Sequence, residues 1–359
     1  MSATDGRARR WPSHLALVAV ASLLLALVPA AHAKPDPSKL TVTAIEVNSL
    51  ALDQFGRANS GEQRFGKLIW RGGMSLTSTS KYFGGLSGLV LDRHGKSFLA
   101  ISDAGVWVAG EIAYRGERPA NLVSVIIGPI RGLNGAPLAR GRDRDCEAIT
   151  STGGSLGKGE LLTSYERNAR IGRHKRDSEG LGKTVELVGL PKDAKRLRGN
   201  GGLEAIAVIQ AGPAKGRIVA FTEKKRDADG HQLGWLIDGK KSRPLRLSNG
   251  TGFQVTDLAA LPDGGLIVLW RDFNWTHGVR MRLERLSAEA LLENGVLQGE
   301  LLLEADNSFN IDNMEALAVS SGESGELVLT LVSDDNFSML QRTLLLQFTL
   351  PEDTATTNP

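Results

Sequence analysis

Apolar runs separated by glycine-containing turns fill most of the chain, and one such unit recurs five times. Each copy has a small or apolar residue, a polar residue and then an apolar run; the copies are 85–92, 146–151, 203–209, 256–261 and 314–320. A glycine turn and a second apolar run follow each copy, at 97–103, 159–167, 216–224, 264–272 and 325–335. Short apolar runs bounded by turns are typical of buried β-strands. The pattern therefore predicts a repeated pair of antiparallel strands.

The repeat spacing indicates the architecture. The aligned polar residues are Ser87, Glu147, Glu204, Asp257 and Glu315, which lie 53 to 60 residues apart. Two more apolar runs usually precede the next copy, so each unit has about four strands, as in a propeller blade. We expect an all-β protein, a β-propeller of five or six blades, over residues 41–350. A β-sandwich is the weaker alternative, because it has no reason to repeat its sequence.

The two ends of this region predict how the ring closes. We expect residues 41–52 to complete a blade begun by 314–320 and 343–350, since shared closure leaves no exposed sheet edge. Residues 67–76 are either an extra strand or part of a sixth blade. The one convincing helix is LSAEALLEN at 286–294.

The N-terminal segment has the pattern of a signal peptide. Arg7, Arg9 and Arg10 precede an apolar run at 15–28, and Ala31-His32-Ala33 supplies a small-x-small cleavage pattern. The run is too short for a membrane span, which needs about 20 residues. We expect cleavage after Ala33 and a periplasmic or secreted protein without a membrane span, exported by either the general or the twin-arginine route. Residues 351–359 are expected to be a flexible tail.

Charge and cysteine content exclude several classes of protein. The formal net charge is +3 and falls to +1 without residues 1–33, so nucleic acid is not an expected partner. With Cys146 as the single cysteine, a disulfide within the chain and a cysteine-cluster metal site are excluded. We expect a monomer without an organic cofactor. The basic run at 167–176 is interpreted as a solvated loop or a rim that attracts phosphate.

Propeller topology places acidic and basic residues on one face. The start of strand one and the end of strand two lie at the same edge, so the polar repeat residues should form a ring. Oxygen ligands from several blades suit calcium, and the predicted metal ligands are Glu147, Glu204, Asp257 and Glu315. The predicted anion contacts are Arg144, Arg167, Lys224 and Arg271. The alternative is that each acid fastens neighbouring blades, with arginine as its partner.

Other candidate chemistry is weaker. Gly153–Gly157 has the G-x-S-x-G pattern around Ser155, but it lies in a turn between two strands instead of a strand-to-helix turn. His94, His174, His231 and His277 are expected in turns and lack metal-ligand spacing. Cys146 takes an apolar position in its repeat and is interpreted as a buried small side chain.

Five segments together resemble a known family. They are FGGLSGLVLD (83–92), SDAGVW (102–107), GRDRDCEAIT (141–150), LEAIAV (203–208) and MEALAV (314–319). They look like the bacterial phytase-like domain, also called "esterase-like activity of phytase". The resemblance implies a propeller that hydrolyses esters or phosphoesters. The Asp-Asp-Pro-Ala segment of the alkaline β-propeller phytases is absent, and 310–313 and 334–336 are only faint echoes of their acidic segments.

The leading interpretation is an exported propeller that hydrolyses small phosphoesters or esters at an acidic channel mouth with the help of calcium. The alternative is a non-catalytic propeller that binds a small molecule or a protein at the same mouth, because the fold hosts both functions.

Overall fold

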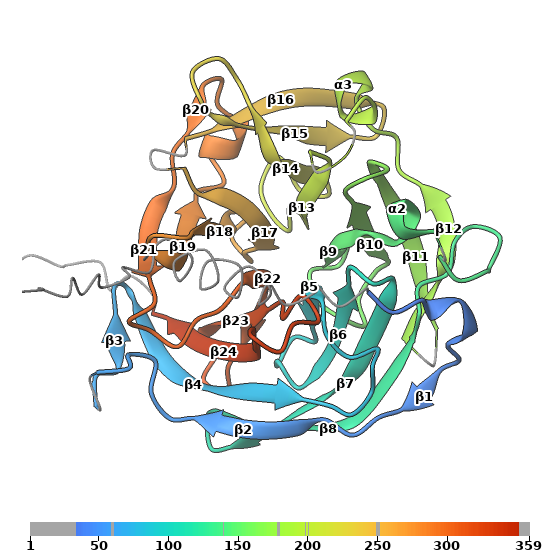
Figure 1. Ribbon diagram of the computed structural model, residues 1–359. Coiled ribbons are helices and arrows are strands. Elements are labelled where there is room, and N and C mark those ends of the chain that lie inside the picture. Colours follow the sequence, from blue (N-terminus) through green and yellow to red (C-terminus); the bar gives the residue numbers. More distant parts are fainter. Residues whose placement is uncertain are drawn as a thin grey trace, which may run out of the picture. The chain divides into compact units, whose positions relative to one another are not determined.

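Five β-sheets form a ring in the computed structural model, which describes residues 34–58, 61–138, 140–177, 180–197, 199, 201–248 and 252–351 (Figure 1). The protein is an all-β, five-bladed propeller. The fold class is therefore confirmed, and the choice between five and six blades is settled at five. The predicted signal peptide at 1–33 and tail residues 352–359 lie outside the described residues.

Each blade begins with one of the repeated strand pairs, and the first strand of the pair lies nearest the axis of the ring. Blade 1 contains β5 (Leu86–Leu91), β6 (Ser97–Ser102), β7 (Val106–Arg115), β8 (Arg118–Pro129) and the short β1 (Thr43–Ala44). Blade 2 contains β9 (Cys146–Ser151), β10 (Leu161–Tyr165), β11 (Arg170–Asp177) and β12 (Gly180–Leu187). Blade 3 contains β13 (Leu203–Val208), β14 (Ile218–Arg226), β15 (Gln232–Asp238), β16 (Lys241–Leu247) and β20 (Val296–Leu297).

The remaining two blades complete the ring. Blade 4 contains β17 (Gln254–Ala260), β18 (Leu266–Asn274), β19 (Gly278–Leu286) and β21 (Glu300–Ala305). Blade 5 contains β22 (Met314–Ser321), β23 (Leu327–Ser333), β24 (Thr343–Leu350), β4 (Leu68–Thr77) and β2 (Asn48–Leu52), with β3 (Arg64–Phe65) paired to β4. Helices in the described ranges are single turns: η2 (Pro37–Lys39), α2 (Gly141–Arg144), α3 (Lys192–Lys195) and η3 (Ala290–Leu292).

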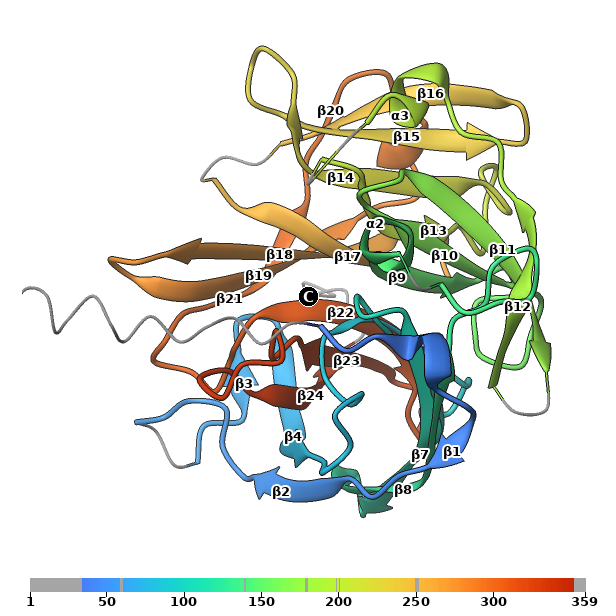
Figure 2. The same cartoon turned by 45° about the vertical axis from the view of Figure 1, so that its right-hand side comes forward.

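The two ends of the chain meet in blade 5. Strand β4 pairs antiparallel with β24, so residues 68–77 form the fourth strand of this blade and not a sixth blade. Strand β2 pairs with β4 on the outer side, as Figure 2 also shows, whereas β1 pairs with β8 of blade 1. The expected closure is confirmed for β2. The segment 41–52 nevertheless divides between two sheets.

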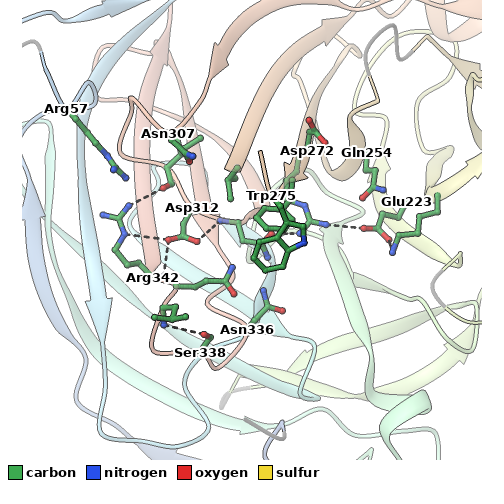
Figure 3. A pocket seen from close by; sticks show the side chains of 18 residues that line it. Arg57, Glu223, Gln254, Asp272, Trp275, Asn307, Asp312, Asn336, Ser338 and Arg342 are labelled. Atoms are coloured by element: carbon green, nitrogen blue, oxygen red, sulfur yellow. Dashed lines mark hydrogen bonds and ion pairs between the residues drawn. The ribbon is translucent and has the colours of Figure 1, made fainter. Parts of the chain in front are cut away.

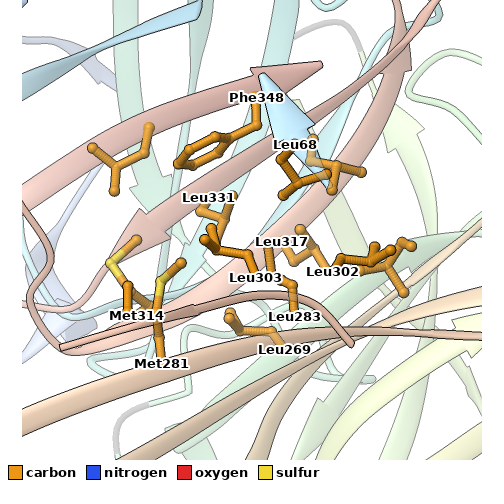
Figure 4. Close-up of a cluster of buried hydrophobic side chains, with 14 of the residues drawn as sticks. Leu68, Leu269, Met281, Leu283, Leu302, Leu303, Met314, Leu317, Leu331 and Phe348 are labelled. Atoms are coloured by element: carbon orange, nitrogen blue, oxygen red, sulfur yellow. The ribbon is translucent and has the colours of Figure 1, made fainter. Parts of the chain in front are cut away.

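A separate hydrophobic cluster fills each of the five interfaces between blades. Strand β18 shows how one strand serves two of them: Ile267 and Leu269 pack toward blade 5, while Val268 and Trp270 pack toward blade 3. Figure 4 shows the cluster between blades 4 and 5. Because side chains alternate between the faces of a strand and both faces are covered, the inner strands are apolar throughout.

Two local predictions were wrong. Residues 286–294 contain only the single turn η3, because β19 extends to Leu286 and leaves too few residues for an independent helix. The basic run at 167–176 is mostly strand β11 instead of a loop. Its His174 is buried and hydrogen-bonds Thr163 Oγ1 and the Gly182 carbonyl, each at 2.9 Å. The many charged residues of this run suggested a loop, but backbone pairing with β10 and β12 on both sides makes it a strand.

Candidate functional site

The polar repeat residues gather at one end of the inner strands. In four strand pairs the register shifts at this point, and the extra residue of the bulge is Ser87, Glu204, Thr256 or Glu315. Blade 2 has the same irregularity beside Glu147. The second strand of each pair runs antiparallel to the first, so it ends at the edge where the first strand begins. They bring Glu166, Glu223 and Arg271 against the first strands.

Five carboxylates form one cluster at this edge. The nearest oxygens of Asp145, Glu147 and Glu166 lie within 4.8 Å of one another, and so do those of Glu166, Glu204 and Glu223. Because Glu166 belongs to both groups, the two are contiguous. All except Glu147, which is partly accessible, are buried. We call these five residues the acidic cluster.

The electrostatics of the acidic cluster follow from burial and like charge. Burial raises the pKa of Glu147 and of Glu204 well above the usual range, and neighbouring carboxylates raise both further. Burial, together with Glu223 and Asp145, raises the pKa of Glu166 to about 7. These carboxylates cannot all ionise together at neutral pH unless a cation compensates their charge.

Unpartnered oxygens provide an independent test of whether a cation fits. Glu166 Oε1 and Glu204 Oε2 are buried and have no hydrogen-bond partner within the described residues. Leaving such an acceptor unpaired costs roughly 1–3 kcal/mol. The donors are all carboxylate oxygens contributed by several strands and turns, which is the chemistry that Ca²⁺ prefers. The residues present therefore fit a hard divalent cation.

Four basic side chains surround the acidic cluster. Arg271 of blade 4 joins its own blade to both neighbours, with Nη1 2.6 Å from Glu315 Oε1 of blade 5 and Nη2 3.0 Å from Glu223 Oε1 of blade 3. Lys224 Nζ lies 2.7 Å from Glu223 Oε2, and Arg167 Nε lies 2.9 Å from Asp145 Oδ2. The fourth is Lys34, which contacts Asp103 and Asp145. Lys224 and Arg167 remain about half exposed and can reach a ligand.

Lys34 inserts its ammonium group beside the cluster. Its Nζ lies 2.5 Å from Asp103 Oδ2 and 3.3 Å from Asp145 Oδ1. Although burial by itself lowers the pKa of Lys34, the two carboxylates raise it overall. Asp103 has room here because Gly85 lies against it with φ +63°; a Cβ on Gly85 would be 2.5 Å from Asp103 Oδ1. Lys34 thus compensates the Asp103 side of the channel mouth.

The family comparison agrees with this architecture. A family model described as "Phytase-like: Esterase-like activity of phytase" matches residues 81–337. The chain belongs to the phytase-like family. The resemblance drawn from the sequence is therefore confirmed, and the match includes all five inner strands.

Other comparisons add little about this phytase-like protein. No curated protein matches its sequence. The endo-arabinase from Bacteroides thetaiotaomicron is 13% identical over 75% of this chain and 95% of that one, with a TM-score of 0.45. The U3-55K structure is 12% identical over 74% and 95%, with a TM-score of 0.39. A hypothetical protein from Leishmania major is 10% identical over 74% and 84%, also with a TM-score of 0.39. Likenesses this distant carry no functional argument.

The register corrects the alignment of Asp257. Leu203 and Val255 occupy equivalent positions before the bulge, so Thr256, not Asp257, corresponds to Glu204. A slip of one residue turns a strand side chain to the opposite face. Asp257 accordingly lies outside the acidic cluster, where Oδ1 accepts from Leu258 N at 2.8 Å and Oδ2 from Leu317 N at 2.7 Å. It fastens blade 4 to blade 5.

The other predicted site residues divide between the cluster and its surroundings. The structure brings Glu147 and Glu204 together, whereas Glu315 is held by Arg271 and by Asn313 Nδ2 at 2.9 Å. Arg144 is partly buried and donates from Nη1 to the Pro35 carbonyl at 2.8 Å, so it holds the N-terminal segment instead of facing the channel.

Sequence reasoning did not single out Asp145 or Lys34. Asp145 stands two residues before Glu147, and this short spacing was a usable signal. Lys34 had no such signal, because its partners Asp103 and Asp145 lie 69 and 111 residues away in the sequence.

The remaining chemical candidates lie elsewhere. Ser155 is in the turn between β9 and β10, where Leu156 N bonds the Leu91 carbonyl at the far end of β5. Cys146 is fully buried, as expected, and burial raises the pKa of its thiol. Within the described residues, no helix is long and apolar enough to cross a membrane.

A groove opens beside the cluster, between blades 4 and 5. Its volume is about 790 Å³, and Glu223, Lys224 and Arg271 line its inner end (Figure 3). The other walls come from the turn between β18 and β19, residues 311–313 and residues 336–342. A small molecule lying in this groove would touch the edge of the acidic cluster.

Proposed function

We propose that this phytase-like protein is an exported hydrolase of small phosphoesters or esters that acts at the acidic cluster with calcium. One observation supports the proposal most strongly: two buried carboxylate oxygens without partners, Glu166 Oε1 and Glu204 Oε2, lie in a cluster of five carboxylates. Burying such groups is costly, and a bound cation would repay that cost.

The contacts of each side chain indicate whether it would bind the metal, attract the substrate or position another residue. Glu166 and Glu204, which form one group with Glu223, would hold Ca²⁺, and Glu147 and Asp145 would lie on the other side of Glu166. When bound, the ion supplies a Lewis acid that polarises a phosphoryl or acyl oxygen. Lys224 and Arg167, half exposed, attract the negative charge of a phosphoester. Arg271 holds Glu223 and Glu315 in place.

Export is part of the proposal. Lys34, the residue after the predicted cleavage position, binds Asp103 and Asp145, so cleavage after Ala33 would leave this contact intact. N-terminal sequencing of protein from the cell envelope should give Lys34 as the first residue. A protein that still begins with Met1 would contradict export by this signal.

A calcium titration of the purified protein tests the hydrolase. Melting temperature and hydrolysis of 4-nitrophenyl phosphate and 4-nitrophenyl acetate are followed together. We expect both stability and turnover to rise with calcium, and Glu204→Gln to diminish both effects. Glu117→Gln, an exposed carboxylate at the β7–β8 turn, is the matched control.

The alternative function is a non-catalytic propeller that binds a small molecule at the same face. It is supported by the pairing of Arg271, Lys224 and Arg167 with acids of the protein itself. An unchanged melting temperature in millimolar calcium, together with no hydrolysis of either ester, would favour this function over the hydrolase. In either case we expect the protein to act as a monomer.

A further inference from the structure

The groove beside the acidic cluster has an aromatic rim. Trp275 is 94% exposed and Phe273 is 54% exposed, and their rings meet edge to face with centroids 5.4 Å apart. Every other tryptophan in the described part of the chain is buried: Trp70, Trp107, Trp235 and Trp270. Leu340, 76% exposed, lines the groove on the side of the 336–342 segment. Large exposed apolar side chains gathered at a groove typically mark a binding site.

Arginines stand at the other end of the groove. In Figure 3, Arg57 and Arg342 lie on one side, Glu223 on the other, and Trp275 between them. Arg57 is exposed and makes no ion pair with any residue that the structure describes. Arg342 Nε is 3.5 Å from Asp312 Oδ2 and its Nη2 donates to the Ile311 carbonyl at 3.1 Å, so these contacts hold the guanidinium beside the groove. Asp272, the nearby acid, is already bound by Arg280 Nε at 3.1 Å.

The groove therefore presents three kinds of contact in order. Its inner end meets the acidic cluster at Glu223, its middle offers an aromatic surface, and its outer end offers two guanidinium groups. Aromatic rings favour edge-to-face or offset contact with another ring. Guanidinium groups pair with carboxylate or phosphate in two parallel hydrogen bonds. A ligand that satisfies both contacts has a ring and an anionic group.

We propose that this groove binds an aromatic organic anion, with the ring against Trp275 and Phe273 and the anionic group at Arg57 and Arg342. The volume of about 790 Å³ suits a small organic molecule. The proposal deepens the proposed function, because the bound anion would be the aromatic part of the ester substrate; only that last identification rests on the hydrolase.

Three matched probes separate the ring from the charge. Phenylphosphonate carries both and cannot be hydrolysed at an ester bond, methylphosphonate lacks the ring, and benzyl alcohol lacks the charge. Their affinities for the purified full chain are measured by calorimetry in calcium-free buffer. We expect phenylphosphonate to bind at least about tenfold more tightly than either of the others, because methylphosphonate loses the ring contact and benzyl alcohol loses the guanidinium contact.

Variants then locate the site. Trp275→Ala should weaken phenylphosphonate about tenfold and leave methylphosphonate unchanged. The double variant Arg57→Gln, Arg342→Gln should abolish the preference for phenylphosphonate over benzyl alcohol. Arg93→Gln, an exposed arginine in the turn between β5 and β6, is the control and should change nothing.

Fluorescence gives a readout that needs no catalysis. Acrylamide should quench Trp275 because it is exposed, and the Trp275→Phe variant supplies the background from the other tryptophans. Bound phenylphosphonate should protect Trp275 from the quencher. Equal affinity for the three probes, or unchanged phenylphosphonate affinity in Trp275→Ala, would overturn the proposal. Phenylphosphonate binding without any calcium-dependent hydrolysis would support the groove and overturn the hydrolase instead.

Discussion

Glu204 and Asp257 show how two blades of the same repeat use a buried carboxylate differently. Both lie near the start of an inner strand, and both are almost fully inaccessible to water. Asp257 receives a backbone N–H at each oxygen, whereas Glu204 leaves Oε2 unpartnered among other acids. One residue of register separates the two environments. Burial alone therefore does not indicate function; the partners decide.

Blade 4 fills the repeat position with a hydroxyl instead. Thr256 Oγ1 donates to the Met314 carbonyl at 3.1 Å, and Ser87 Oγ donates to the Cys146 carbonyl at 2.6 Å. Met314 and Cys146 begin the inner strands of the next blades. The fastening that the sequence suggested for every repeat residue is thus made by the short hydroxyl side chains, by Asp257 and, through Arg271, by Glu315. Glu147 and Glu204 lie in the acidic cluster instead.

The largest expected effect separates fastening from metal binding. Asp257→Ala removes the acceptor for Leu258 N and Leu317 N and should lower the free energy of unfolding by about 4 kcal/mol. Urea denaturation with and without calcium measures the loss, which should be the same in both. Asp238→Ala, an exposed carboxylate, should cost less than about 0.5 kcal/mol. A loss seen only with calcium would place Asp257 in the metal site after all.

His174 provides a second buried, fully partnered group. Burial lowers its pKa to about 4, against an unfolded value near 6.5. Since the unfolded chain binds the proton more readily, stability should be full above the unfolded pKa and fall with pH toward 4, by roughly 3 kcal/mol at most. The free energy of unfolding of wild type and His174→Gln is compared between pH 4 and 7. Equal slopes would show that His174 does not carry this dependence.

Calcium binding should distinguish Glu204 from Asp257. Stability of the wild type should rise by about 2.7 kcal/mol at a hundredfold excess of calcium over Kd. Glu204→Gln should reduce that gain, because it removes a charged ligand at nearly constant shape. Without calcium the variant should be at least as stable as wild type, since one member of a like-charge cluster is gone. Thermal denaturation measures both, and a calcium-free Glu204→Gln protein that is much less stable would argue for fastening.

The smallest expected effect concerns Ser155. It lies in the β9–β10 turn, away from the acidic cluster, so Ser155→Ala should change stability by less than about 0.5 kcal/mol. Ester hydrolysis should also be unchanged. A loss of turnover in a kinetic assay would move the chemistry from the acidic face to this turn.

The sequence by itself determined the all-β repeat, the propeller and the edge at which Glu147 and Glu204 lie. Alternating apolar residues and a fixed repeat period are local signals, and antiparallel topology converts them into a common face. The family resemblance was also present in short segments such as 83–92 and 141–150.

Tertiary structure alone decided the register at the bulges, the formation of strand β11 and the contacts of Lys34. The bulge in each inner strand pair set the register, which exchanged Asp257 for Thr256. Pairing on both sides made most of the basic run at 167–176 part of strand β11 and buried His174. Lys34 reached Asp103 and Asp145 only because the fold returns the N-terminal segment to the channel mouth. Each of these outcomes depends on contacts between residues distant in sequence, and the local pattern of apolar and polar residues does not predict such contacts.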